Sequence, residues 1–416
     1  MRTAYIALFI ALTAAAPSQA QLGLPPLLPV PGEVINRTTE AVGTALGSST
    51  RQIARQLEQL RLDRIDVLLR SNRGTIERDI NGAPARRGEL LMLDPAPEVL
   101  AQLKQAGFEL AEQRLLAGLG MTVTRLNIPK GMSLVSAQQL VARLAPSSEV
   151  TADQLHFASG ASGKIALHRG RSLIPTPITE PVGVIDGAPG RATPVAAIKS
   201  FASGDARANN HGSAVASLLS RAGVRRIYAA DVYGGDPAGG GAFAIARALD
   251  WLVGQKVRVI SVSLVGPANP VLARAIAAAR ARGTTIVAAV GNDGPAAPPS
   301  YPASYSGVLA VTGVDGRNRA LIEAGRALHL DYAAPGADLL AANAAGRMVK
   351  VRGTSFATPL VAARAAAALQ SGESPTIVSI LDREARDLGK RGPDTVFGRG
   401  LLCGECKNKS LNNSDM

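Results

Sequence analysis

Apolar runs rich in β-branched residues alternate with alanine-rich segments over residues 182–369, and this pattern constrains the fold most. The apolar runs lack polar alternation, which is typical of strands buried on both faces. They lie at residues 182–185, 226–231, 257–264, 285–290 and 308–314. Helices are expected at 213–221, 243–252 and 271–282, and again after the turn at 353–355. The alternation predicts an α/β fold with a mostly parallel, doubly wound sheet flanked by helices.

A smaller α+β unit is predicted ahead of this domain, at residues 88–157. Its apolar stretches follow the order β-α-β-β-α-β, which suits an open sheet with two helices on one face. Residues 158–181 are rich in Gly, Ser, Arg and Pro and are predicted to form an accessible processing loop. The larger domain then spans 182–402, and residues 403–416 form a polar tail.

The first 20 residues have the features of a secretory signal peptide. A single Arg precedes a short apolar core, and small residues follow at the expected cleavage position. Residues 21–87 are interpreted as a linker and an amphipathic helix, with apolar residues at helical spacing from Ile53 to Leu69. No later stretch is predicted to span a membrane. The mature protein is expected to be exported, either to the periplasm or to the extracellular medium.

Charge and cysteine content limit the possible partners. The net charge is +13, but the arginines are spread along the chain without interleaved aromatic residues. A solvated basic surface is therefore favoured over nucleic-acid binding. Cys403 and Cys406 are the only cysteines and no histidine lies near them, so zinc binding would need further ligands. The pair is interpreted as a local disulfide or as having no function.

Polar residues follow several predicted strands and could meet at one edge of the sheet. Asp186 ends the first strand, Asn292 follows another, and His211 opens a helix. Ser355 stands at the start of the last helix, where unpaired backbone N–H groups favour negative charge. A serine nucleophile needs a base, histidine suits that role, and a carboxylate can orient the imidazole. Each residue alone could be a cap or turn former, but together they indicate acyl transfer.

Residues 182–402 resemble the subtilisin-like serine peptidases. The motifs are VGVIDG around Asp186, NHGSAVASLL around His211, SVSLVGP at 261–267, AAVGNDG around Asn292 and RGTSFATPLVA around Ser355. The resemblance implies that Ser355 is the nucleophile, His211 the general base and acid, and Asp186 its orienting carboxylate. It implies that Asn292 belongs to the oxyanion hole. It also implies that four residues pair with a peptide substrate: Ser263, Leu264, Val265 and Gly266.

The chain departs from the family pattern at a few positions. Gly187 replaces the usual Thr after the catalytic Asp, HGSA replaces HGTH, and Val265 stands where the substrate-binding wall has Gly. None removes a catalytic group, so the departures bear on substrate preference. No metal or other cofactor is expected. Calcium binding stays an open alternative, although no calcium loop is recognised in the sequence.

Residues 88–157 resemble the propeptide of such enzymes, which implies a self-processed zymogen inhibited by its own propeptide. A permanent accessory domain is the alternative. The expected function is hydrolysis of peptide bonds in polypeptides by a secreted serine endopeptidase, through an acyl-enzyme. A catalytically silent subtilisin-like binding protein is the alternative. The Gly-rich run at 234–241 lacks a nucleotide-binding pattern and is interpreted as a flexible loop near the substrate cleft.

Overall fold

The computed structural model describes residues 50–165, 177–372 and 376–406. The predicted signal peptide at 1–20, residues 21–49 of the predicted linker, residues 166–176 of the predicted processing loop and residues 407–416 of the tail lie outside the described residues.

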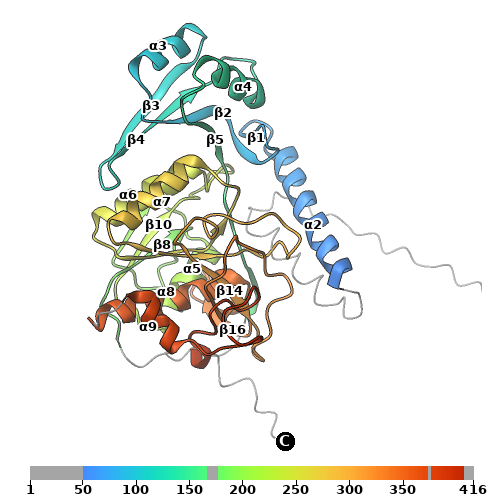
Figure 1. The fold of residues 1–416 in the computed structure, drawn as a ribbon, viewed down its shortest axis with the longest axis vertical. Helices are drawn as coiled ribbons and strands as arrows, with labels where there is room; N and C mark the ends of the chain where they lie inside the picture. Colours follow the sequence, from blue (N-terminus) through green and yellow to red (C-terminus); the bar gives the residue numbers. More distant parts are fainter. Residues whose placement is uncertain (1–49, 166–176, 373–375, 407–416) are drawn as a thin grey trace, which may run out of the picture.

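A seven-stranded parallel sheet forms the centre of the larger domain (Figure 1). Its strand order is β15-β14-β13-β11-β8-β10-β9. The strands are β8 (Val182–Asp186), β9 (Ala197–Ser200), β10 (Ile227–Asp231), β11 (Val259–Val262), β13 (Thr285–Ala289), β14 (Leu309–Val314) and β15 (Tyr332–Pro335). The predicted parallel, doubly wound α/β sheet is confirmed. The two outermost strands, β9 and β15, were not predicted; they have four residues each.

Helices cover both faces of this sheet. On one face lie α5 (Asn210–Arg221) and α8 (Thr354–Gln370), and on the other lie α6 (Ala242–Gly254) and α7 (Pro270–Ala281). Neighbouring side chains of β8 enter opposite cores, because Val184 packs in the cluster of α5 and α8 and Ile185 in that of α6 and α7. This burial on both faces explains why the strands are continuously apolar.

Short strands frame the edge where the polar residues meet. The predicted strand at 257–264 is divided by Ser263 into β11 and the short β12 (Leu264–Val265). The hairpin of β16 (Leu339–Ala342) and β17 (Met348–Arg352) leads through Gly353 into α8. The sequence placed residues 349–352 next to the last helix without recognising this hairpin.

The smaller unit has the predicted β-α-β-β-α-β order. Its elements are β2 (Pro84–Leu93), α3 (Pro97–Gln105), β3 (Glu109–Leu116), β4 (Met121–Asn127), α4 (Leu134–Leu144) and β5 (Val150–Gln154). The sheet begins earlier than the predicted residue 88, because β1 (Ile76–Arg78) pairs antiparallel with β2. The intervening turn is closed by the carboxylate of Asp79, which accepts the N–H groups of Asn81 and Ala83. Its Asn81-Gly82 dipeptide is a recognised turn signal.

The smaller unit rests on α6 and α7, while α3 and α4 cover its far side (Figure 1). Leu91, Leu116 and Val123 of its sheet share one core cluster with Leu249 of α6. Asp153 of β5 accepts the N–H of Phe243 in the first turn of α6 at 3.0 Å. The carboxylate therefore satisfies one of the unpaired donors at that helix start.

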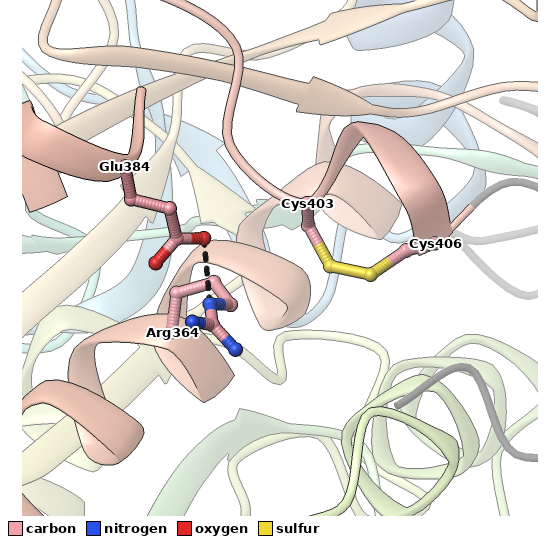
Figure 2. Close-up of a disulfide and its surroundings, with 4 residues drawn as sticks. All are labelled: Arg364, Glu384, Cys403 and Cys406. Carbon is pink, nitrogen blue, oxygen red and sulfur yellow. Dashed lines mark hydrogen bonds and ion pairs between the residues drawn. A yellow bond between two sulfur atoms is a disulfide. The ribbon is translucent and has the colours of Figure 1, made fainter. Parts of the chain in front are cut away.

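The C-terminal elements pack against α8 (Figure 2). Arg364 of α8 donates from Nε to Glu384 at the end of α9 (Ile377–Glu384), at 2.6 Å. Cys403 and Cys406 form a disulfide beside this pair, as one of the two sequence interpretations expected (Figure 2). Among the helices of the described residues, none is both long and apolar enough to cross a bilayer.

Candidate active site

Asp186 and His211 form a buried pair at the carboxyl end of β8. The Nδ1 atom of His211 lies 2.8 Å from Oδ2 and 3.0 Å from Oδ1 of Asp186. Asp186 is fully buried and His211 is 7% exposed. The side chain of Asn209 caps α5 by accepting the N–H of His211 at 2.7 Å. Asn209 thus fixes the first turn of α5 and with it the imidazole, a positioning role that the sequence analysis did not assign.

Close packing around Asp186 explains one departure from the family pattern. A Cβ atom on Gly187 would lie 2.5 Å from Cβ of Asn209, and one on Gly212 would lie 1.8 Å from the Gly187 carbonyl oxygen. A side chain at position 187 would therefore displace the residue that caps α5. Gly187 itself donates its N–H to Asp186 at 2.7 Å, which adds a further hydrogen bond to the carboxylate.

Ser355 lies in the first turn of α8 and is fully buried. The turn before it requires glycine, because Gly353 has a φ of 139°. A Cβ atom at Gly353 would also lie 2.7 Å from Nδ2 of Asn292. Pro359 is the sixth residue of α8 and lies beyond the first turn, near which the sequence had suggested it. The carbonyl oxygen of Ser355, which Pro359 leaves without an intrahelical donor, accepts the hydroxyl of Ser263 at 3.0 Å.

The side-chain amide of Asn292 is held in one orientation beside this turn. Its Oδ1 accepts the N–H of Thr354 at 3.0 Å, while its Nδ2 is buried and has no hydrogen-bond partner. A buried donor without a partner is unfavourable unless a ligand or a transient charge completes it. The arrangement leaves one amide donor available next to Ser355.

The chain itself runs through this site, over residues 155–160, which we call the threaded segment. Strand β6 (Phe157–Ala158) pairs antiparallel with β12, and the N–H of Ser159 donates to the carbonyl oxygen of Ser263 at 3.2 Å. The carbonyl oxygen of Ser159 accepts the backbone N–H of Ser355 at 3.1 Å. The Oγ of Ser355 also donates to this oxygen. Ser159 thus presents its carbonyl group to the predicted nucleophile.

The described part of the predicted processing loop is therefore not an open loop. After Gly160 the chain continues as β7 (Ala161–Ile165), which pairs antiparallel with β17. Ser159 is only 3% exposed. Low periodicity in the sequence did not reveal these strands, because their pairing partners lie more than a hundred residues away. The signal for Ser159 and Gly160 is contextual: they follow the last strand of the smaller unit.

Gly160, the last residue of the threaded segment, lies next to the imidazole of His211. A Cβ atom there would lie 2.6 Å from Cε2 of Phe356 and 3.2 Å from Nε2 of His211. That Nε2 is buried and has no hydrogen-bond partner. The hydroxyl of Ser355 instead bonds to the Ser159 backbone carbonyl and lies 2.7 Å from the Ser159 hydroxyl oxygen. The imidazole therefore faces the peptide unit that follows Ser159.

A second wall holds the threaded segment from its other side. His156 donates its N–H to Gly240 at 2.8 Å and accepts the hydroxyl of Tyr233 at 2.9 Å. The Gly-rich run, interpreted from the sequence as a flexible loop near the substrate cleft, thus contacts the threaded segment through Gly240. The His156 ring is fully buried against Gly266, where a Cβ atom would lie 2.5 Å from it. Burial lowers the pKa of His156 to about 4.

All of the predicted site residues come together around the threaded segment. Ser263 through Gly266 lie along residues 156–159 on one side. His211, Asn292 and Ser355 lie beside the Ser159–Gly160 peptide unit, and Asp186 reaches it only through its contact with His211. A cavity of about 480 Å³ adjoins Ser159 and is lined by Val265, Asn292 and residues of the helix α2 (Thr50–Ser71), among others. Within the described residues, one cluster has metal-ligating composition: Cys403, Glu405 and Cys406. Its sulfurs are joined in the disulfide and are not available as thiolates.

Comparison with known proteins identifies relatives of the larger domain. The subtilase family model matches residues 199–400. Subtilisin BL of Lederbergia lenta is 32% identical over 213 residues, which cover 48% of this chain and 78% of the relative.

Two solved structures share the fold. Fervidolysin from Fervidobacterium pennivorans, a keratinolytic enzyme related to subtilisin, superposes with a TM-score of 0.63 and 17% identity. The match covers 80% of this chain and 63% of that protein. The epidermin leader peptide processing serine protease of Staphylococcus aureus has a TM-score of 0.59 and 14% identity, over 77% of this chain and 97% of its own.

Proposed function

The chain belongs to the subtilase family of serine peptidases, and from this premise we propose that it is a secreted endopeptidase made as a self-processing zymogen. Asp186, His211 and Ser355 carry the reaction. The bond that the zymogen cuts in itself is Ser159–Gly160. The carrying observation is the threaded segment, whose Ser159 carbonyl accepts the Ser355 N–H inside a β-paired strand.

In the proposed mechanism, His211 removes the proton from Ser355 as Oγ attacks the carbonyl carbon of Ser159. Asp186 holds the imidazole through Nδ1 and stabilises its charged form, which leaves Nε2 as the base. His211 then protonates the amide nitrogen of Gly160, and the new amino terminus leaves. Water, activated by the same imidazole, releases Ser159 from the acyl-enzyme. The position of Gly160 beside Nε2 supports this proton route.

The developing negative charge lies between two donors. One is the backbone N–H of Ser355, and the other is the unpartnered Nδ2 of Asn292. Both are fixed before the reaction, since Thr354 anchors the amide of Asn292 and α8 anchors Ser355. Preorganised donors of this kind stabilise the oxyanion without reorganisation. External substrates are polypeptides that bind as a strand along residues 263–266, in place of the threaded segment.

Secretion of wild-type and Ser355→Ala chains tests the proposal. We expect the wild type to yield a fragment whose amino terminus is Gly160 by Edman degradation or mass spectrometry. The Ser355→Ala chain is expected to keep the bond intact. Equal processing of both chains at Ser159–Gly160 would refute self-cleavage and point to another protease. The two chains differ by one oxygen atom, so folding is not expected to separate them.

Fluorophosphonate labelling separates the peptidase from a silent binding protein. Ser355 is covered by the threaded segment in the uncut chain, so labelling is expected only after the segment leaves. A cut and separated domain that still does not label would favour the binding protein. The proposal of export depends on the signal-peptide features of the first 20 residues. If it is correct, the cut enzyme is recovered outside the cytoplasm.

A further inference from the structure

Helix α2 lies against the catalytic domain although it precedes the β-α-β-β-α-β unit (Figure 1). Two residues carry this contact. Arg64 forms an ion pair with Asp293, with 2.6 Å between Nη2 and Oδ1. Leu57 is 3% exposed and packs on Gly294, where a Cβ atom would lie 2.8 Å from its Cδ1. Asp293 and Gly294 directly follow Asn292, so the helix rests on the loop that supplies the proposed oxyanion donor.

The middle of α2 lines the cavity beside the bond proposed to be cut. Arg61, Leu62, Arg64 and Ile65 line this cavity together with Ser159 and Asn292. In this position the helix restricts the space that adjoins the side chain of Ser159. In a bound peptide substrate, the residue that precedes the cleaved bond takes the position of Ser159. Its side chain must therefore enter the same cavity.

The end of α2 also contacts the threaded segment. Leu68 and Leu69 pack with Leu155 and Phe157 in one apolar cluster. The helix therefore touches both the strand that fills the cleft and the loop that borders it. These contacts are independent of the larger interface, which the sheet of the smaller unit makes with α6 and α7.

We propose that the loop around Asp293 and Gly294 is a docking surface for α2, and that the docked helix is a second inhibitory contact. The proposal rests on the proposed self-cleavage at Ser159–Gly160, after which α2 belongs to a separate polypeptide. Helix α2 and the threaded segment up to Ser159 belong to the same polypeptide. While one of them is bound, it therefore keeps the other at a high effective concentration near the cleft. Loss of the helix contact frees the cavity and speeds release of the strand.

Hydrogen–deuterium exchange of the full chain tests the docking without any catalysis. In a Ser355→Ala background, Arg64→Glu replaces attraction to Asp293 by repulsion. We expect about tenfold faster exchange in peptides covering 53–65 and 291–297, and no change in 84–127. Arg55→Glu is the matched control, since Arg55 is an exposed residue of the same helix. The charge-swapped pair Arg64→Glu with Asp293→Arg is expected to restore slow exchange.

The inhibitory role is measured in chains that retain Ser355. Arg64→Glu is expected to advance the onset of peptide hydrolysis about tenfold relative to Arg55→Glu, with the onset measured from the time at which the Ser159–Gly160 cut is complete in each chain. Exchange rates that are equal in the two variants would overturn the docking surface. Faster exchange with an unchanged onset would overturn the inhibitory role. A wild-type chain that never cuts itself would refute the self-processing, and the exchange measurement would still decide the docking.

Discussion

Ser355 donates its backbone N–H to the carbonyl oxygen of Ser159, a residue 196 positions earlier in the chain, at 3.1 Å. The same N–H is one of the unpaired donors at the start of α8. A helix start that would otherwise need a cap is therefore completed by the peptide group of Ser159. If the chain cuts itself after Ser159 as proposed and that group leaves, the donor becomes available to another carbonyl, so the proposed self-processing would be linked to binding of substrate.

Gly160→Val is expected to slow self-cleavage about a hundredfold. The first side-chain carbon would lie 2.6 Å from the Phe356 ring, so the peptide must move from the geometry that suits attack. The rate is measured from the loss of the full-length band over time. Ser159→Ala is the control, because alanine fits the same position and should be cut within a few-fold of the wild-type rate. Equal rates for Gly160→Val and wild type would contradict the assignment of the cut bond.

Asn292→Ala is expected to lower kcat of the mature enzyme while KM changes little. The missing amide would act mainly on the transition-state charge, and removal of the corresponding donor in subtilisin costs about a hundred- to a thousand-fold. Steady-state hydrolysis of a peptide p-nitroanilide gives both constants. Thermal unfolding serves as the control, since the lost bond to Thr354 must not unfold the domain. A rise in KM at constant kcat would show that Asn292 binds substrate rather than the oxyanion.

Asp186→Asn is expected to lower kcat by about ten-thousand-fold, as such replacements do in other triad proteases. The amide keeps the size of the carboxylate but offers His211 the wrong tautomer and no counter-charge. Hydrolysis should fall while fluorophosphonate labelling slows in parallel. Retention of more than a tenth of the activity would mean that the Asp186–His211 contact, 2.8 Å long, does not serve catalysis.

Local patterns in the sequence predicted most of the central sheet and the polar residues at its edge. Strands such as β8 and β13 are buried on both faces and are continuously apolar, so their composition identifies them. The edge strands β9 and β15 have only four residues each, and no periodicity distinguishes them from loops. Turn chemistry at Asn81-Gly82 indicates the β1–β2 hairpin, but the surrounding stretch is rich in Arg and Gly, a composition more typical of a loop than of strands.

The threaded segment could not be predicted from its own residues. Pairing of β6 with β12 and of β7 with β17 depends on partners that are distant in the sequence, and the segment is too short to show a pattern. Asn209 differs, because an Asn directly ahead of a helix is a local capping signal. Only its close packing with Gly187, 22 positions earlier, depends on the tertiary fold. Spacing identified the reacting groups, whereas their supports depend on tertiary contacts.

The stability of the contact between the smaller unit and the larger domain is expected to depend on pH through two buried groups, whose effects have opposite signs. Burial raises the pKa of Asp153 to about 7, and repulsion from Glu89 adds to the shift. The stability that protonated Asp153 contributes to the folded chain is therefore fully present below its ordinary pKa and is lost as the pH rises towards 7. Burial lowers the pKa of His156 to about 4. The stability that neutral His156 contributes to the folded chain is therefore present above its ordinary pKa near 6.5 and is lost as the pH falls towards 4.

Single variants separate these two terms in a Ser355→Ala chain. Relative to that parent, Asp153→Asn should become more stable as the pH rises from about 4 to 7, whereas His156→Gln should become less stable from about 4 to 6.5. Thermal midpoints at several pH values give both slopes. Slopes of the same sign would show that at least one of these groups does not titrate as its burial predicts.

Val265→Gly is expected to widen the preference for the residue that precedes the cut. A Cγ atom of Val265 lies 3.3 Å from the place of a Cβ on Gly291, so the valine side chain fills space between two walls next to Ser159. The wild type should prefer small residues such as the Ser that it cuts in itself. Matched peptides with Ala or Phe at that position measure the ratio of kcat/KM. The ratio of Phe to Ala is expected to rise about ten- to a hundredfold in Val265→Gly, because a few methyl groups are worth that discrimination in a pocket. Val265→Ala should give an intermediate value, and an unchanged ratio across the three chains would assign the preference to another wall of the pocket.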